Sequence, residues 1–578
     1  MSTTPFNTNS PGGPATTIPL YAPPSTGAPI DLHLDANEGP PSACGVDVAR
    51  IVKALGPQAV RRYPSAAALE RLIAQHWGVA PSRVLVTAGG DEAIDRVCRV
   101  MLAPGREIIL PAPTFEMIPR YARLAGAEIV TTEWNEGPYP LEQVLACVTE
   151  RTAMIAVVSP NNPTGAVATA DDLKQLASSA CGAALLVDCA YAEFADEDLT
   201  PAALELPNAI VIRTFSKAFG MAGLRVGYAI GPEHHIRAMR AAGSPFPVSG
   251  LSLAVAQDSF NQASRILQEP VSRVRAERNR LCAVLTELGA RPRPTQGNFV
   301  LADFDDADWV WRALAGLGIG VRRFPAGSGL ERSLRITCPG QEAGFKRLCL
   351  GLRATLSPQA ILFDMDGVIA DVSGSCRQAI TLTAESFGVS TTPGEVSAAK
   401  AEGNANNDWV LTQRLLMRRG VDAPLQEVTT RFETLYNGYD GMPGLAAAEQ
   451  LIPDRALLER LAERLPLAIV TGRPRRDCEL FLERFGLMRL FSATVCMEDG
   501  PAKPNPGTVH RALELLSAEA AWMIGDTPDD VVAARTAGVV PIGIAPPGDA
   551  DSQTTGAMER AGTARVLSSL QELEDMLP

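Results

Sequence analysis

The sequence lacks several features that would place it in a specialised class of proteins. It has no sustained run of lysine and arginine, and its formal net charge is -13 at pH 7. Nucleic acids and anionic membranes attract basic surfaces, so this balance predicts no nucleic acid and no membrane as partner. No apolar run approaches the roughly 18 to 20 residues that a membrane helix requires. The acidity of the chain therefore indicates solubility rather than a charged partner.

Cysteine patterns and targeting signals are also missing. The 11 cysteines form no CxxC pair and no metal-like spacing with the 5 histidines, which is typical of thiols in a reducing compartment. Residues 1–30 contain no charged side chain and are rich in Thr, Pro, Gly and Ser, which predicts a flexible tail. This tail has neither the basic start nor the longer apolar block of a signal peptide, so we expect a cytoplasmic protein.

The length of 578 residues predicts at least two domains, because a single hydrophobic core rarely grows so large. Short β-branched runs alternate with longer helical patterns, and a second such series starts at 360–363. Residues from about 371 to 442 are instead helical in pattern and poor in strands. We therefore predict an α/β fold in two parts, residues 31–356 and 357–578, with the helical stretch as a cap inserted into a doubly wound core.

Five ordered motifs in the first part have the residue types that a cofactor site needs. A lysine follows a predicted strand, with hydroxyls beside it and an arginine eight residues further on. Each residue alone has an ordinary interpretation, such as a solvated lysine or a capping aspartate. In chain order the motifs are PTF at 113–115, SPNNPTG at 159–165, DCAY at 188–191, TFSK at 214–217 and GLRVG at 223–227. Together they resemble the fold-type I aminotransferases over most of residues 31–350.

This resemblance implies a large and a small α/β domain and a pyridoxal phosphate cofactor. Lys217 would hold the cofactor covalently and then move a proton, while Asp188 would keep the ring nitrogen protonated. Asn162 and Tyr191 would bind the phenolic oxygen of the ring, and Phe115 would stack on its face. The phosphate would be held at a helix start and by side chains nearby, namely Gly90, Asp91, Thr214, Ser216 and Arg225. Tyr63 resembles the family tyrosine that reaches the phosphate of the neighbouring subunit, which implies a homodimer.

Three segments resemble the histidinol-phosphate aminotransferases more specifically: LDANE at 34–38, AGGDEAID at 88–95 and LRIT at 334–337. The resemblance implies that Asn37, Arg322 and Arg335 bind the substrate, with both arginines on its phosphate. The reaction would convert histidinol phosphate and 2-oxoglutarate to imidazole acetol phosphate and glutamate. The sequence departs from the family pattern at Gly39, Phe115 and Cys189, so an aromatic-amino-acid aminotransferase and a phosphothreonine decarboxylase stay open.

Four ordered motifs in the second part resemble the haloacid-dehalogenase superfamily: ILFDMDGV at 361–368, VTGR at 470–473, KP at 503–504 and GDTPDD at 525–530. The resemblance implies that Asp364 attacks phosphorus and that Asp366 protonates the leaving group and later activates water. Thr471 and Lys503 would stabilise the phosphoryl oxygens. Magnesium would bind Asp364, Asp526 and the backbone carbonyl of Asp366, with Asp530 anchoring the site.

The sequence says little about what the cap recognises. The expected substrates are small molecules: an amino-phosphate ester, a 2-oxo acid and a phosphomonoester. Histidinol phosphate is a candidate for the phosphatase because the first part would handle the same compound. A phosphoglycolate or sugar-phosphate phosphatase, a phosphomutase, and a chain in which one half is only a regulatory module are the alternatives.

Overall fold

The structure is a computed structural model that describes residue 18 and residues 20–41, 45–440, 442–545 and 552–577. The predicted tail at 1–30 lies largely outside these residues. Where it is described, at 20–30, the chain forms neither helix nor strand. Among the helices of the described segments, none has the length and apolar content needed to cross a bilayer.

The described residues form two compact units. The first contains residues 34–305 and 322–345, and the second contains residues 25–33, 306–321 and 346–577. These units differ from the predicted parts, since α13 (Ala307–Gly316) and most of α14 (Glu342–Leu356) belong to the second unit. The physical reason is an aromatic contact, in which Trp309 of α13 meets Trp522 edge to face with ring centroids 4.9 Å apart. The predicted boundary at 356 to 357 stays a prediction.

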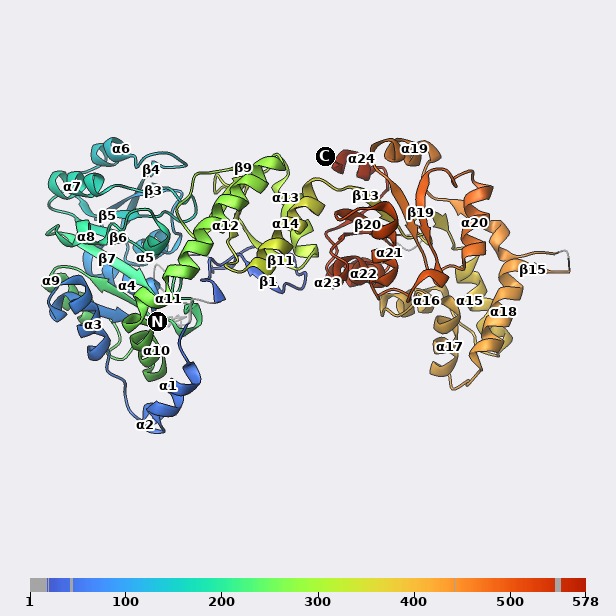
Figure 1. Cartoon of the computed structure of the whole chain (residues 1–578), viewed down its shortest axis with the longest axis horizontal. Coiled ribbons are helices and arrows are strands. Elements are labelled where there is room, and N and C mark those ends of the chain that lie inside the picture. The colour runs from blue at the N-terminus through green and yellow to red at the C-terminus, as the bar shows by residue number, and fades with distance from the viewer. Residues whose placement is uncertain (1–17, 19, 42–44, 441, 546–551, 578) are drawn as a thin grey trace, which may run out of the picture. The chain divides into compact units, whose positions relative to one another are not determined.

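A seven-stranded sheet forms the centre of the first unit, in the order β2-β8-β7-β6-β5-β3-β4. Of these described strands, only β8 runs antiparallel to its neighbours. The strands are β2 (Val84–Thr87), β3 (Glu107–Ala112), β4 (Glu128–Glu133), β5 (Thr152–Val158), β6 (Ala184–Asp188), β7 (Ala209–Thr214) and β8 (Gly227–Ile230). Figure 1 shows these strands, with the helices of the same unit around them.

Both faces of this sheet are buried, as the apolar runs of the sequence predict. Ile108 and Leu110 pack with α4 (Gly89–Met101), α5 (Met117–Leu124) and α9 (Glu233–Ala241). Ile109, between them, packs instead with α6 (Leu141–Ala146), α7 (Ala170–Ser179) and α8 (Thr200–Leu204). Successive side chains of a strand point to opposite faces, so one run of apolar residues fills two cores.

Further helices and a second sheet complete this part of the chain. The helices are α1 (Val48–Leu55), α2 (Gln58–Arg61), α3 (Ala67–Trp77), α10 (Gly250–Asn261), α11 (Ala263–Ile266) and α12 (Gln268–Glu287). The sheet has the order β1-β11-β12-β10-β9, with antiparallel pairing of β11, β12, β10 and β9. Its strands are β1 (Leu32–Leu34), β9 (Arg291–Pro292), β10 (Phe299–Asp303), β11 (Ile319–Arg323) and β12 (Ser333–Thr337).

A six-stranded parallel sheet forms the core of the second unit, in the order β19-β18-β13-β20-β21-β22. The strands are β13 (Ala360–Phe363), β18 (Leu467–Val470), β19 (Phe491–Val495), β20 (Ala521–Gly525), β21 (Val540–Ile544) and β22 (Arg565–Leu567). Val509 of α21 (Gly507–Leu516) and Ala533 of α22 (Pro528–Thr536) pack on one face. Parallel neighbours end at the same edge, so the residues after β13, β18 and β20 meet there.

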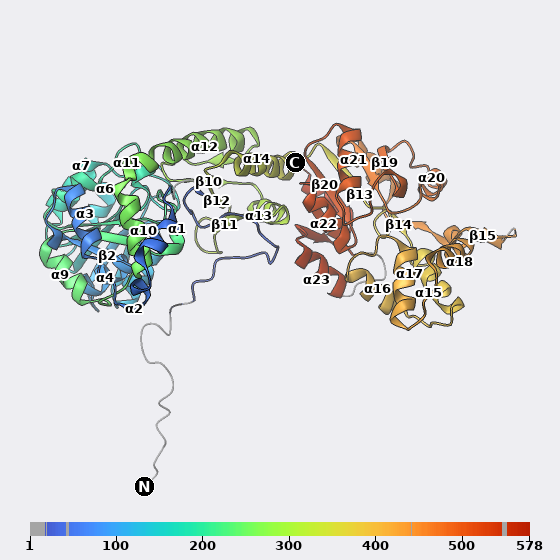
Figure 2. The same ribbon diagram turned by 60° about the horizontal axis from the view of Figure 1, so that its bottom comes forward.

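Four of the helices between β13 and β18 form a cluster beside this sheet, which Figure 2 shows near β14 (Ala370–Asp371). They are α15 (Cys376–Ser386), α16 (Pro393–Ala401), α17 (Asp408–Arg418) and α18 (Leu425–Asn437). Helices α15, α17 and α18 lie side by side in both views. They occupy the residues predicted as a cap, and the two buried sheets confirm the predicted α/β fold.

Candidate active sites

A pocket of about 660 Å³ lies in the first unit, where β6 and β7 end. Parallel strands direct their carboxyl ends to one edge of the sheet, which is where open α/β sheets bind ligands. Most residues predicted from the aminotransferase motifs line this pocket: Gly90, Asp91, Phe115, Asn162, Asp188, Tyr191, Thr214, Ser216, Lys217, Arg225, Arg322 and Arg335. Tyr21, before β1, and Asp35, directly after β1, also line the pocket, and the motifs predicted no role for either residue.

Lys217 lies three residues after the end of β7. Its amine donates a hydrogen bond to the carbonyl of Ala36 at 3.0 Å and lies 5.7 Å from the centre of the Tyr191 ring. Burial lowers the pKa of Lys217 to about 8, and the nearby guanidinium of Arg335 acts in the same direction. An amine with this pKa is partly neutral near pH 7, as a nucleophile and proton carrier must be.

Asp188 ends β6 and is buried at the base of the pocket. Its carboxylate accepts the backbone N–H of Ala190 at 3.0 Å. Burial raises the pKa of Asp188 to about 7, although that hydrogen bond and the charge of Lys217 oppose the rise. A buried carboxylate with a raised pKa is stabilised when a cation binds beside it. Asp188 can therefore accept a protonated nitrogen of a bound ring.

Tyr191 is held in place by Asn37, whose side-chain amide donates to the tyrosine oxygen at 3.1 Å. Asn37 is itself fixed by Thr337 of β12, through a 3.1 Å bond from its backbone N–H and a 3.1 Å bond to its side-chain oxygen. Its backbone has φ 51°, a left-handed conformation that asparagine tolerates better than most residues. The predicted substrate residue Asn37 therefore acts on Tyr191 in this structure.

The predicted phosphate site lies at the start of α4, where backbone N–H groups lack helical partners. The hydroxyls of Thr214 and Ser216 lie 2.9 Å apart, and Arg225 forms a 2.9 Å ion pair with Asp91. Gly227 of β8 lies so close that a Cβ there would be 2.5 Å from the carbonyl carbon of Gly89. This contact places β8 directly against the start of α4. An anion can therefore approach the predicted phosphate site only from the side that faces the pocket.

Arg335 projects from β12 into the same pocket and is 7% exposed. Its guanidinium donates to the side-chain oxygen of Asn162 and to the backbone carbonyl of Asp35 at 2.6 Å. Its Nε is buried without a hydrogen-bond partner among the described residues. Burial lowers the pKa of Arg335 to about 10. A buried cation with an unused donor is suited to an anionic ligand.

Two predicted residues have other surroundings. Arg322 lines the pocket but donates a hydrogen bond to Glu116 at 2.8 Å. An anionic ligand would therefore have to displace Glu116 in order to bind Arg322. Tyr63 is 82% exposed and stacks on Phe246 with ring centroids 4.7 Å apart. Tyr63 is not part of the pocket of its own chain. Its predicted role requires a second subunit and stays a prediction.

The second site lies at the edge where β13, β18 and β20 end. Asp364 follows β13, Asp526 follows β20, and Asp530 lies in the first turn of α22. Ligand oxygens of these three buried carboxylates all lie within 4.8 Å of one another. Burial raises the pKa of Asp364 and of Asp526, and the neighbouring carboxylates add to both rises. Such crowded negative charge requires a cation for its stabilisation.

Lys503 supplies one positive charge to this group. Its amine lies 2.7 Å from Asp364, donates to the carbonyl of Val470 at 3.0 Å and forms a short ion pair with Asp530. Burial opposes its ionisation, but the carboxylates raise its pKa. Thr471, directly after β18, is buried beside them and accepts the backbone N–H of Arg473 at 3.1 Å. One lysine against three carboxylates leaves room for a divalent cation.

Asp366 is separate from that trio. Its carboxylate accepts Nε of Arg473 at 2.6 Å, while the other guanidinium nitrogens of Arg473 bind Glu449 at 3.0 Å. Tyr436 of the cap donates to the same Glu449 carboxylate at 2.9 Å. The side chain of Asp366 is therefore fixed by Arg473, and both its predicted role in proton transfer and the metal role of its backbone carbonyl stay predictions.

Several residues at the second site were not predicted from the motifs. Arg473 belongs to the VTGR motif without a predicted role, and its buried partner Glu449 lies in a segment without any motif. Lys400 of the cap lies 3.3 Å from Asp408, and although burial opposes it, Asp408 and Asp526 raise its pKa. Lys400 and Asp408 belong to cap helices that are far from the motifs in sequence. Only the fold brings them close to the motif residues.

Comparison with known proteins identifies both regions. Residues 34–352 match the family model of aminotransferase class I and II, and residues 358–538 match that of haloacid dehalogenase-like hydrolases. Histidinol-phosphate aminotransferase of Thermoanaerobacter sp. (strain X514) is 33% identical over 336 residues, which are 56% of this chain and 94% of the relative. Histidinol-phosphate aminotransferase from Sinorhizobium meliloti, solved with pyridoxal-5'-phosphate, has 24% identity and a TM-score of 0.54, covering 61% of this chain and 99% of that one. This structure supports the fold alone.

A third relative matches a smaller fraction of the chain at higher identity. Imidazoleglycerol-phosphate dehydratase of Phytophthora nicotianae is 45% identical over 237 residues, which are 38% of this chain. The chain spans only 52% of that relative's length. Both predicted enzyme families are confirmed by the family models. The chain therefore belongs to the aminotransferase class I and II family, and its C-terminal part is a haloacid dehalogenase-like hydrolase domain.

Proposed function

We propose that the chain catalyses two reactions at separate sites. At the first site it transaminates histidinol phosphate with 2-oxoglutarate, using pyridoxal phosphate. At the second it hydrolyses a phosphomonoester through Asp364, using magnesium. The observation that carries the first reaction is the convergence of Lys217, Asp188 and Arg335 in one pocket. The observation that carries the second is the trio of buried carboxylates around Lys503.

The pocket residues fit pyridoxal phosphate on grounds of charge and size. Its volume of about 660 Å³ lies within the roughly 300 to 1,000 Å³ usual for cofactor sites. Asp188 would hold the ring nitrogen, Lys217 would hold the cofactor, and Thr214, Ser216 and Arg225 would bind its phosphate. When bound, the cofactor supplies an electron sink for the pair released at the substrate carbon. Aminotransferases of this class use that cofactor, which supports the assignment.

The chain's own groups account for the proton transfers. The lowered pKa of Lys217 allows its amine to accept a proton near neutral pH and return it to a neighbouring carbon. Asp188 would keep a proton on the nitrogen of a bound ring by remaining ionised beside it. Tyr191 accepts a hydrogen bond from the side-chain amide of Asn37, which fixes the tyrosine in the same pocket. Asp188 and Tyr191 lie at and just after the end of β6, and Lys217 follows the neighbouring strand β7.

Replacing Asp188 by Asn should change stability in a pH-dependent way. The pKa of Asp188 is raised from 3.8 to about 7 in the folded chain, so folding is favoured by protonation of this group and opposed by its ionisation. As pH rises from 3.8 to about 7, the cofactor-free wild type should lose up to about 1.4 kcal/mol of stability for each pH unit. Asp188→Asn lacks this loss and should melt above the wild type at pH 8, by calorimetry, but not at pH 4.

The matched control for that experiment is Asp196→Asn, which changes an exposed aspartate a few residues away. It should follow the wild type at both pH values. The Asp188 variant should also lose most of its transamination rate while keeping bound cofactor. Identical melting of wild type and Asp188→Asn at pH 8 would mean that Asp188 already has a cationic partner, against the proposed role.

Arg335 is the proposed ligand of the substrate phosphate. Its buried guanidinium has an unused Nε, and the named histidinol-phosphate aminotransferases among the relatives support a phosphorylated substrate. Arg335→Ala should lower kcat/KM for histidinol phosphate roughly 10- to 100-fold, the range for a charge-assisted hydrogen bond. Cofactor affinity, followed by absorbance titration, should be retained. The control Arg332→Ala removes an exposed arginine three residues away and should change neither value.

The competing substrates can be separated with the same enzyme. Phenylalanine in place of histidinol phosphate tests the aromatic-amino-acid alternative, and phosphothreonine with detection of carbon dioxide tests the decarboxylase. A clear preference for either, or loss of bound cofactor in Arg335→Ala with an unchanged KM, would contradict the proposal.

The carboxylate trio fits magnesium, because it offers only oxygen ligands and carries more negative charge than Lys503 neutralises. Bound there, the metal supplies charge neutralisation for a transferring phosphoryl group. Asp364 would attack phosphorus, and Lys503 with Thr471 would stabilise the phosphoryl oxygens. Asp366, held by Arg473, would protonate the leaving oxygen and then accept a proton from water.

The proposal includes a homodimer formed through the aminotransferase domain. The exposure of Tyr63 and its position outside the lining of its own pocket support this, since an exposed side chain can reach a neighbouring subunit. For the phosphatase we propose histidinol phosphate as substrate. The relative named imidazoleglycerol-phosphate dehydratase supports an imidazole-containing phosphate ester as the class of compound, but its dehydratase activity has no counterpart in this proposal.

A further inference from the structure

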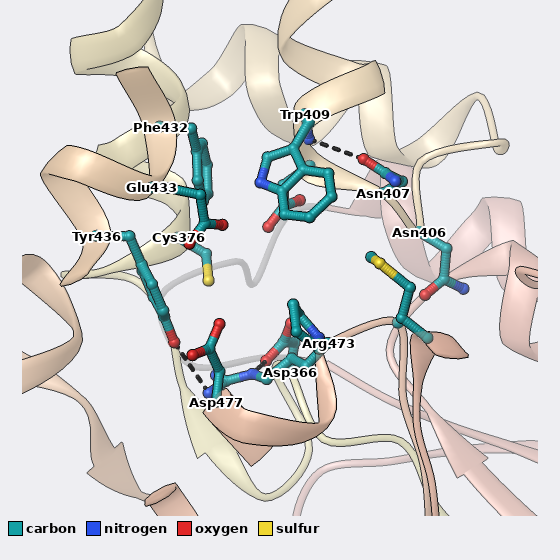
Figure 3. Close-up of a pocket in the computed structure, with 14 residues that line it drawn as sticks. Asp366, Cys376, Asn406, Asn407, Trp409, Phe432, Glu433, Tyr436, Arg473 and Asp477 are labelled. Atoms are coloured by element: carbon teal, nitrogen blue, oxygen red, sulfur yellow. Dashed lines mark hydrogen bonds and ion pairs between the residues drawn. The ribbon is translucent and has the colours of Figure 1, made fainter. Parts of the chain in front are cut away.

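A cavity of about 40 Å³ lies beside Asp366, between the cap helices and the strand edge of the second unit. Figure 3 shows Trp409, Phe432 and Tyr436 around it on the cap side, with Asp366, Arg473 and Asp477 opposite. This volume holds only a group of a few atoms, so an ester whose leaving oxygen reaches Asp366 can place only the end of its leaving group in this space. The wall of the cavity therefore determines which phosphomonoesters fit.

Negative charge dominates that wall. Asp408 and Glu433 face the cavity from α17 and α18, and Asp477 faces it from α20 (Arg475–Arg484). Asp408 lies 3.3 Å from Lys400, and the charge of Arg473 is divided between Asp366 and Glu449. Glu433 and Asp477 are left as the carboxylates with the least compensation.

Glu433 and Asp477 line the same cavity, and the charge of Asp477 acts on Glu433. Burial raises the pKa of Glu433, and the charge of Asp477 adds to the rise, while the hydrogen bond from Asn437 and the charge of Arg476 oppose it. Burial also raises the pKa of Asp477, against Arg473 and the exposed Arg476. Two half-buried carboxylates on facing elements form a site that a cationic group would stabilise.

Aromatic rings line the same wall. Trp409 lines the cavity together with Glu433, and its backbone N–H donates to the side-chain oxygen of Asn407 at 3.0 Å. Phe432 and Tyr436 stack with ring centroids 6.0 Å apart, and the Tyr436 hydroxyl is bound to Glu449. Aromatic faces attract cations as well as flat rings, and they do so more strongly when water is excluded. The cavity thus combines rings with carboxylates that have little compensation.

We propose that this pocket selects phosphomonoesters whose leaving group ends in a cationic, flat or aromatic moiety, bound by Glu433 and Asp477 and packed on Trp409. The inference rests on the proposed phosphatase function of Asp364 and identifies the substrate class of that site. It disfavours esters with a second anionic group, such as phosphoglycolate, because their carboxylate would face Glu433 and Asp477. An alkylammonium or imidazolium group meets the requirement.

The test compares three benzyl phosphates that differ only at the para position, with aminomethyl, hydroxymethyl or carboxyl groups. para-Nitrophenyl phosphate serves as a general reporter of the phosphatase. We expect kcat/KM for the aminomethyl ester to exceed that for the hydroxymethyl ester by roughly 10- to 100-fold, mainly through KM. The carboxyl ester should be the poorest substrate.

Glu433→Gln and Asp477→Asn should each remove most of this preference while leaving the hydroxymethyl ester and the reporter unchanged. The matched control is Glu427→Gln, an exposed glutamate on the same helix α18. The two substitutions lie on different helices, α18 and α20. If one variant misfolds, it will lose hydrolysis of the reporter, and the other variant still tests the proposal.

The outcomes separate the two claims. If Asp364-dependent hydrolysis of the reporter occurs but the three esters react alike, or the carboxyl ester is preferred, the cation-binding pocket is refuted and the phosphatase stands. An equal loss on all esters in both variants would also refute it, since the carboxylates would then support the fold only. Absence of any Asp364-dependent hydrolysis would overturn the phosphatase, and the inference with it.

Discussion

Lys217→Ala should reduce transamination on the order of 10³-fold or more, because one positioned proton-transfer group contributes roughly 10² to 10⁴. The variant also loses the amine that would hold the cofactor covalently. Borohydride reduction followed by mass spectrometry should therefore find pyridoxal phosphate attached to the wild-type chain at Lys217 and none attached to the variant. Phosphate release by the second site should be unchanged.

The control is Lys174→Ala, which removes an exposed lysine from α7 and leaves the pocket intact. It should retain both activities and the covalent label. A Lys217 variant that transaminates at the wild-type rate would contradict the assignment, as would a label found on another lysine. Lys217 is assigned as the cofactor-binding lysine because its amine lies in the pocket and has a pKa lowered to about 8.

Asp364→Asn should lower magnesium-dependent phosphate release by roughly 10⁴-fold or more, the scale on which loss of a catalytic nucleophile acts. A neutral amide is a poor nucleophile for phosphorus and a poor ligand for a hard cation. The substitution keeps the shape of the side chain and the hydrogen-bonding capacity toward Lys503, so the fold should be preserved. Transamination should continue at the wild-type rate.

Two further measurements complete this prediction. A metal chelator should abolish phosphate release by the wild type, and magnesium should restore it, without effect on transamination. Asp422→Asn, an exposed position in the loop before α18, is the matched control and should remain active. Residual hydrolysis in Asp364→Asn that still depends on magnesium would show that another group attacks phosphorus.

The residues that follow strands directly are the parts of the sites that the sequence predicts best. Asp188 ends β6, and Asp364 follows β13, so their positions depend only on local strand patterns and on the parallel order of the sheets. A buried strand appears in a sequence as a continuous apolar run, and a polar residue that ends the run marks the edge of the sheet. The α/β fold was predictable for the same reason, whereas both enzyme families were predicted from the resemblance of the ordered motifs to known families.

Contacts between distant segments were not predictable. The bond between Asn37 and Tyr191 spans 154 residues, and the ion pair between Asp366 and Arg473 spans 107. The cap residues Trp409 and Glu433 belong to amphipathic helices whose patterns resemble those of any surface helix. Their position beside Asp366 follows from tertiary packing, for which a single sequence carries no local signal.

The most direct test of the central claim, two independent active sites in one chain, is a single assay of four proteins. Wild type, Lys217→Ala, Asp364→Asn and the double variant are each incubated with histidinol phosphate, 2-oxoglutarate and magnesium, and glutamate and inorganic phosphate are followed together. We expect both products from the wild type, only phosphate from Lys217→Ala, only glutamate from Asp364→Asn, and neither from the double variant. Loss of both products in either single variant, or release of neither product by the wild type, would contradict the account.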